Sequence, residues 1–229
     1  MSVEGSGQEY PQRAVGGKNT PDHQTSGPSI TIGLMGGTFD PIHYGHLILA
    51  EQALEQFGLE KVLFVVAGSP PHKTDQEVTD ASHRYKMTCL AVEYNEGFEV
   101  SSIEMDRQGP SYTIDTVKQI LDMYGASTRV HLLLGADEAR DLMTWRDPYG
   151  IAELVTIVVA NRPGLSVMES LEALPADFAK AVVPMTMPGV DISSTDLRER
   201  VSAGRSVRYL VPDAVEEYIS GNGLYRGTR

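Results

Sequence analysis

The stretch Thr-Ile-Gly-Leu-Met-Gly-Gly-Thr-Phe-Asp-Pro-Ile-His-Tyr-Gly-His, residues 31–46, joins a strand pattern to a glycine-containing loop. Ile30, Ile32 and Leu34 alternate with small residues, which predicts a strand running into the two glycines. Apolar residues then recur every three or four positions from Leu47 to Phe57, which predicts a helix. The stretch therefore predicts a strand–loop–helix unit whose loop lies at the carboxyl end of the strand.

The same alternation continues along the chain. Further strands are predicted over residues 62–66, 98–105, 130–134, 154–160 and 181–186. Further helices are predicted over residues 82–94, 113–124, 167–174, 195–203 and 213–220. Strands that alternate with helices favour one doubly wound, Rossmann-like α/β domain with a mainly parallel sheet and a small helical C-terminal appendage. Ligands of such sheets bind at the carboxyl ends of the strands.

Composition narrows the function classes. Residues 1–28 are rich in Gly, Ser, Pro and Gln without an apolar period, so this extension is expected to be disordered and residues 29–229 to form the domain. The net charge of −12 disfavours nucleic acid and anionic membranes as partners. The single cysteine, Cys89, precludes an internal disulfide, and no secretory pattern or membrane-length apolar run is present, so we expect a cytoplasmic protein. Whether it forms a homo-oligomer stays open.

The first loop has the residue types of a phosphate site. Gly36 and Gly37 allow close approach of a ligand to the backbone, and Thr38 and Phe39 follow them. His43 and His46 are three apart, so both rings would lie on one side of a helix that begins here. Rings at a helix N-terminus can donate hydrogen bonds to phosphate oxygens. A pair of surface histidines and a pair of zinc ligands are the alternatives that this spacing alone leaves open.

A second candidate phosphate site lies about 150 residues further on. Residues 192–198 read Ile-Ser-Ser-Thr-Asp-Leu-Arg, in which Ser193 and Asp196 fit the capping box of a helix. An ordinary capped helix would explain these two residues. The hydroxyls of Ser193, Ser194 and Thr195, together with Arg198, could equally hold a second phosphate group.

Together the two motifs resemble the nucleotidyltransferase superfamily, whose His-x-Gly-His element is shared with class I aminoacyl-tRNA synthetases. Three further stretches resemble one of its families, the bacterial nicotinate mononucleotide adenylyltransferases. They are Pro-Ser-Tyr-Thr-Ile-Asp-Thr at 110–116, Gly-Ala-Asp at 135–137 with Trp145 downstream, and Asn-Arg-Pro-Gly at 161–164. The resemblance runs from about Ile30 to Tyr225, nearly all of the chain outside the N-terminal extension.

The resemblance implies adenylyl transfer from ATP to nicotinic acid mononucleotide, giving deamido-NAD and pyrophosphate. It implies that ATP is bound by Gly36, Gly37, Thr38, Phe39, His43, His46, Gly135, Asp137, Ser193, Ser194, Thr195 and Arg198, with His43, His46 and Arg198 catalytic. It implies that the mononucleotide is bound by Lys73, Tyr112, Thr113, Trp145 and Arg162. Mg²⁺ is expected to enter with ATP, without a dedicated protein site. For Asp40, we expect a role in capping the following helix rather than in touching a metal-bound water.

Other functions make different predictions. A phosphopantetheine or cytidylyl transferase would share the two phosphate motifs but lack the three further stretches. A non-catalytic nucleotide-binding regulator would have lost a histidine or Arg198, and a tRNA synthetase fragment would carry a Lys-Met-Ser-Lys-Ser element. The amide mononucleotide is an alternative acceptor. A nicotinate carboxylate at the start of the helix beginning at Thr113 would gain more from its N–H groups than an amide, so we expect preference for the acid.

Overall fold

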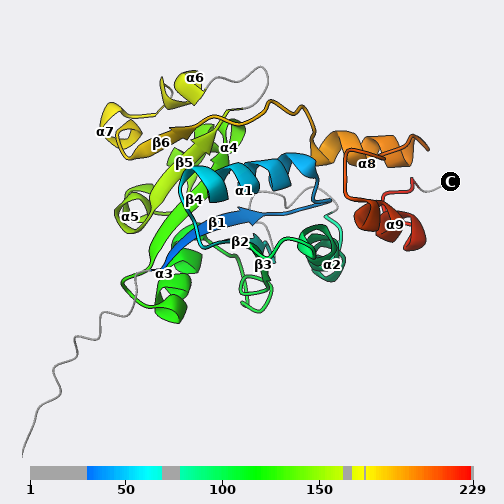
Figure 1. Ribbon diagram of the computed structural model, residues 1–229, viewed down its shortest axis with the longest axis horizontal. Coiled ribbons are helices and arrows are strands. Elements are labelled where there is room, and N and C mark those ends of the chain that lie inside the picture. Colours follow the sequence, from blue (N-terminus) through cyan, green and yellow to red (C-terminus); the bar gives the residue numbers. More distant parts are fainter. Residues whose placement is uncertain (1–29, 69–77, 162–166, 173, 228–229) are drawn as a thin grey trace, which may run out of the picture.

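The computed structural model describes residues 30–68, 78–161, 167–172 and 174–227 (Figure 1). The predicted disorder of residues 1–28, and the predicted site residues Lys73 and Arg162, lie outside the described residues. The rest of the chain builds one sheet with helices on both faces.

All six strands of this sheet are parallel and follow the order β3-β2-β1-β4-β5-β6. They are β1 (Thr31–Gly37), β2 (Lys61–Val66), β3 (Phe98–Ser101), β4 (Arg129–Gly135), β5 (Thr156–Ala160) and β6 (Val182–Met185). The order reverses at β1, between β2 and β4, which is the arrangement of a doubly wound sheet. The predicted fold class is therefore confirmed.

Helices cover both faces of the sheet (Figure 1). They are α1 (Tyr44–Gln56), α2 (Ala81–Val92), α3 (Thr113–Tyr124), α4 (Ala136–Arg140), α5 (Pro148–Leu154), α6 (Val167–Glu172), α7 (Ala176–Ala179), α8 (Ser194–Ser202) and α9 (Asp213–Gly221), with a 3-10 turn η1 (Leu142–Thr144). Leu133 belongs to the apolar cluster that also contains residues of α1, α2, α8 and α9, whereas Leu132 and Leu134 belong to the cluster that contains residues of α3, α4, α5 and α7. This alternation is what strand geometry imposes on consecutive apolar residues in a strand that is buried on both sides.

Three segments differ from the prediction, and one of them is the short helix α7, which lies where no element was expected. The strand expected over 98–105 ends at Ser101, because the chain then turns, with the Asp106 N–H donating to the Ser102 carbonyl at 3.0 Å. The short helices α4 and α5 and the turn η1 between them were not predicted from the pattern. Leu154, expected in a strand, is the last residue of α5.

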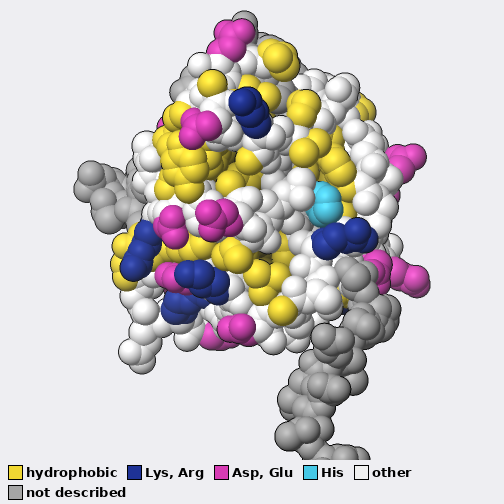
Figure 2. Space-filling model, turned by 90° about the vertical axis from the view of Figure 1, so that its left-hand side faces the viewer, with side chains coloured by type: hydrophobic (Ala, Val, Ile, Leu, Met, Phe, Trp, Pro, Cys, Tyr) yellow, Lys and Arg dark blue, Asp and Glu magenta, His cyan; other side chains and the backbone are white. Residues whose placement is uncertain are grey.

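Figure 2 shows the surface of the molecule that lies on the left-hand side in Figure 1, and side chains of all types are mixed on this surface. On this face, among the described side chains, lysines and arginines are interrupted by acidic and hydrophobic ones, so they form no continuous basic surface there. No helix in the described part of the chain is long and apolar enough to cross a bilayer.

Candidate active site

A cavity of about 500 Å³ opens at the carboxyl ends of β1 and β4. Its wall joins the β1–α1 loop, the start of α3, the β4–α4 junction, the segment after η1 and the start of α8. The predicted site residues that line it are Gly36, Gly37, Thr38, Phe39, His43, His46, Tyr112, Thr113, Gly135, Asp137, Trp145, Ser193 and Ser194. Segments far apart in the sequence thus meet at the edge of the sheet where a ligand was expected.

The loop after β1 is shaped by its two glycines in different ways. A Cβ added at Gly37 would lie 2.8 Å from the ring of Phe39, so only glycine leaves that ring in place. Phe39 itself takes a left-handed conformation, φ 50°, and is almost fully buried. A Cβ added at Gly36 would meet nothing within 4 Å, because this residue faces the open cavity.

If ATP binds at this strand end, as the motif resemblance implies, Gly36→Ala should fold normally and lower kcat/KM for ATP by roughly 10–100-fold, because the methyl would displace a closely bound phosphate. Steady-state kinetics with varied ATP, beside a thermal melt, would measure both. Gly221→Ala is the matched control, because its Cβ also meets open space but lies on α9. Unchanged ATP kinetics in Gly36→Ala would contradict a close approach of ATP to this strand end.

The two histidines are packed face to face at the start of α1. Their ring centroids are 3.7 Å apart with an interplanar angle of 25°, and the edge of Phe39 contacts His46. The His43 backbone N–H donates to Nδ1 of His46 at 3.2 Å. Because Nδ1 accepts, the neutral His46 ring carries its proton on Nε2, which makes Nε2 a donor.

A backbone N–H group at the N-terminus of α1 already has a hydrogen-bond partner within the protein. The Tyr44 N–H donates to the Leu210 carbonyl at 3.1 Å. His43 is the N-cap residue, in an extended conformation. The expectation that Asp40 caps this helix was wrong: its carboxylate lies below the loop and accepts from the Thr79 N–H at 3.2 Å and the Tyr225 hydroxyl at 2.7 Å.

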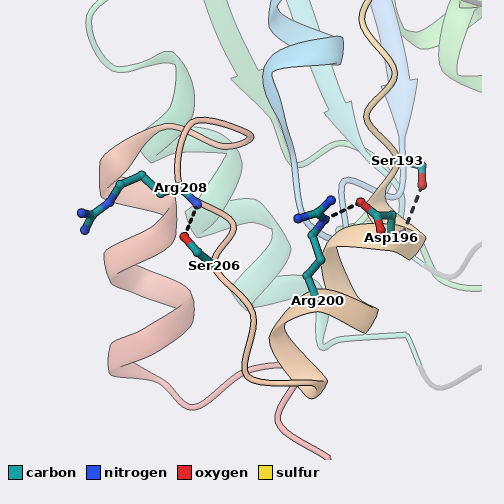
Figure 3. Close-up of polar contacts among 5 residues, drawn as sticks. All are labelled: Ser193, Asp196, Arg200, Ser206 and Arg208. Atoms are coloured by element: carbon teal, nitrogen blue, oxygen red, sulfur yellow. Dashed lines mark hydrogen bonds and ion pairs between the residues drawn. The ribbon is translucent and has the colours of Figure 1, made fainter.

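The start of α8 has the predicted cap (Figure 3). The Ser193 hydroxyl accepts from the Asp196 N–H at 3.1 Å, as a Ser N-cap does. The Asp196 carboxylate pairs instead with Arg200, at 2.7 Å, so only half of the expected capping box forms. The cap fixes where Ser194 and Thr195 begin the helix.

The two phosphate motifs are tied directly to each other. The Ser194 hydroxyl donates to the Pro41 carbonyl at 2.9 Å, and Arg198 Nη1 donates to the Asp40 carbonyl at 2.8 Å. Arg198 also contacts the exposed Thr195 hydroxyl at 3.3 Å. Thr195 and Arg198 are not among the residues that line the cavity, but Arg198 contacts the β1–α1 loop, which does line it.

A buried arginine that the sequence analysis did not identify supports this loop. Arg84 of α2 is 1% exposed. It donates to the carbonyls of Thr38 at 2.8 Å, Thr79 at 2.8 Å and Gly68 at 3.1 Å. Burial lowers the pKa of Arg84, and the carboxylates of Asp40 and Asp80 oppose that shift. Arg84 therefore joins the ends of β1 and β2 to the entry of α2.

The opposite end of the cavity is aromatic and polar. Tyr112 is the N-cap of α3, and Thr113 begins that helix. Trp145 is half-buried and lines the cavity, so it is not a fully buried core residue. Gly135 and Asp137 also line the cavity, at the junction of β4 and α4.

A polar chain behind α3, also missed, holds this end in place. Arg107 donates to the Thr116 hydroxyl at 3.1 Å, which in turn donates to Glu104 at 2.6 Å. A second Arg107 nitrogen donates to Gln119 at 2.6 Å. Burial raises the pKa of Glu104, while its bond from Thr116 lowers it. The chain fixes the segment between β3 and α3 that carries Tyr112.

These features define the nucleotidyltransferase class, and the family model described as cytidylyltransferase-like matches residues 34–200. A Thermus thermophilus protein named probable nicotinate-nucleotide adenylyltransferase is 48% identical over 195 residues, covering 85% of this chain and 99% of the relative. A Thermoanaerobacter protein of the same name is 46% identical over 200 residues, covering 86% and 95%. The chain belongs to the family of nicotinate-nucleotide adenylyltransferases.

Solved structures have the same fold. The nicotinic acid mononucleotide adenylyltransferase of Plasmodium falciparum complexed with NaAD matches with a TM-score of 0.71 at 17% identity, covering 86% of this chain and 97% of that one. Its complex with APC gives a TM-score of 0.70 at the same identity. At this identity the likeness speaks for the fold alone.

Proposed function

We propose that this protein transfers the adenylyl group of ATP to nicotinic acid mononucleotide, forming deamido-NAD and pyrophosphate in NAD biosynthesis. The observation that carries the proposal is one cavity lined both by the paired histidines and the α8 start, from one face of the sheet, and by Tyr112, Thr113 and Trp145, from the other. A cavity of this kind can hold two substrates in line. Membership of the family supports the same reaction.

The reaction needs positioning more than a nucleophilic side chain. An oxygen of the mononucleotide phosphate attacks the α-phosphorus of ATP. As that bond forms, the bond from the α-phosphorus to the oxygen bridging the β-phosphate breaks, and pyrophosphate leaves. The role of the protein is to align two anions and neutralise developing charge.

We assign ATP to the end built from the β1–α1 loop and α8. Nε2 of His46 would donate to a phosphate oxygen, with His43 stacked behind it. The hydroxyls of Ser193 and Ser194 would face the leaving pyrophosphate, with Thr195 and Arg198 beside them. Gly135 and Asp137 would contact the adenosine.

The mononucleotide would occupy the other end. Its pyridine ring would lie near Tyr112, Thr113 and Trp145, where α3 starts. Lys73 and Arg162 are proposed to bind its phosphate on the strength of the motif resemblance alone.

Mg²⁺ is proposed to enter with ATP. Within the described residues, His, Cys, Asp and Glu nowhere gather in groups of three that could hold a metal ion. The hydroxyls of the cavity suit a hydrated Mg²⁺ held mainly by phosphate oxygens, where it would neutralise phosphate charge. A cytoplasmic location is proposed from the single cysteine and the NAD-biosynthetic reaction.

Pyrophosphate release from ATP with a panel of acceptors tests the proposal. We expect turnover with nicotinic acid mononucleotide, slower turnover with the amide form and none with phosphopantetheine. The acid preference follows from the partial positive charge at the start of α3. Absence of turnover with the acid form would refute the function, and equal use of the amide would refute the preference.

A further inference from the structure

Arg146 stands out in the charge balance of the cavity wall. Among the described residues it is the only lysine or arginine lining the cavity, whereas Glu104, Asp137 and Glu138 are carboxylates that line it. Glu104 lies at the acceptor end, bonded to Thr116. An acceptor with a carboxylate on its ring therefore needs a positive charge nearby to offset this repulsion.

The backbone around Arg146 is fixed on both sides. Before it, the Trp145 N–H donates to the Leu142 carbonyl at 3.1 Å and closes η1. After it, Asp147 takes a left-handed conformation, φ 53°, and its side chain accepts from the Gly150 N–H at 3.1 Å to cap α5. The three-residue connection thus presents the Arg146 side chain to the cavity from a defined position.

The guanidinium of Arg146 reaches across to the start of α3. Its central carbon lies 4.7 Å from the ring centroid of Tyr112, and Nη1 lies 4.0 Å from Asp115 Oδ2. The side chain of Arg146 is 61% exposed, so the ion pair with Asp115 is long and screened by water. Turning the guanidinium from Asp115 toward a ligand would therefore cost little.

We propose that the Arg146 side chain binds the ring carboxylate of the acceptor and selects the acid mononucleotide over the amide, an inference that rests on the proposed function. The planar guanidinium pairs with a carboxylate through two parallel hydrogen bonds. A carboxamide offers one oxygen, and its NH₂ meets only donors on the guanidinium. The cation–π contact with the Tyr112 ring keeps the guanidinium near the part of the cavity that we assign to the pyridine ring.

The test compares Arg146→Gln, Arg146→Lys and the control Arg140→Gln, which removes an exposed arginine of α4 outside the cavity wall. kcat/KM is measured for the acid and the amide mononucleotide at saturating ATP, with a thermal melt for each variant. In Arg146→Gln we expect kcat/KM for the acid to fall about tenfold, mainly through KM, with the amide changed less than about twofold. Arg146→Lys should retain part of the preference, and Arg140→Gln all of it.

Each outcome decides between explanations. An unchanged acid-to-amide ratio in Arg146→Gln, or an equal loss with both acceptors, would overturn the role of Arg146 while leaving the proposed function intact. A wild-type enzyme that does not use the acid form would overturn the proposed function itself, and Arg146 with it. A selective loss with the acid form, partly restored by lysine, supports the inference.

Discussion

The His46→Ala enzyme is expected to fold and to turn over about 10²–10³-fold more slowly, with most of the loss in kcat. Removal of one preorganised donor to a developing phosphate charge has effects of this size. Nδ1 of His46 is engaged by the His43 N–H at 3.2 Å, which leaves Nε2 to carry the proton that a phosphate oxygen would accept. Pyrophosphate release under saturating substrates measures the loss.

Two amide variants separate the roles of the two nitrogens of His46. In His46→Asn the amide oxygen can replace Nδ1 as acceptor for the His43 N–H, but the donor at the Nε2 position is lost. In His46→Gln the amide nitrogen can replace Nε2 as a donor, while the acceptor is lost. We expect His46→Asn to melt like the native protein yet be nearly inactive, and His46→Gln to recover part of the turnover. Full activity in His46→Asn would remove the phosphate role.

Most of the sheet could be predicted, because each central strand is a short apolar run and the loops carry the turn residues. Val62–Val66 and Val130–Leu134 are examples of strands buried on both faces, where nearly every residue is apolar. The segment from Ala136 to Leu154 escaped prediction, since helices of five or seven residues hold too few turns to show a period. Such helices depend on tertiary packing for their stability.

The site motifs were predictable because each follows a strand, and parallel strands end at the same edge. The long-range contacts that hold these motifs in position were not predictable. Asp40 illustrates the reason, because its partners Thr79 and Tyr225 are 39 and 185 residues away and no local pattern links them. Arg146 could be placed next to Trp145, but its contact with Tyr112 depends on how η1 and α5 direct the chain.

A signal for Arg84 was present in α2. Arg84 precedes the buried Met87 and Thr88 by three and four residues, so a helical period places it on the buried face. A charged residue at such a position must find partners inside the protein. Its partners are three backbone carbonyls. Every residue has a backbone carbonyl, so the sequence does not indicate which ones accept from Arg84.

The Arg84→Met substitution is expected to destabilise the protein by about 3–5 kcal/mol and to lower Tm by roughly 6–20 °C. Methionine can fill much of the buried volume, but it leaves the carbonyls of Thr38, Gly68 and Thr79 without their donor. The loss of the Thr38 contact should also loosen the β1–α1 loop. We therefore expect turnover to be reduced even at temperatures well below Tm, where the variant is still folded. Chemical denaturation and kinetics at 25 °C measure the two effects. Lys86→Met, at an exposed position of the same helix, is the control and should change neither. A variant at Arg84 with native stability would show that these three carbonyls find water instead, and that the loop holds its shape without the arginine.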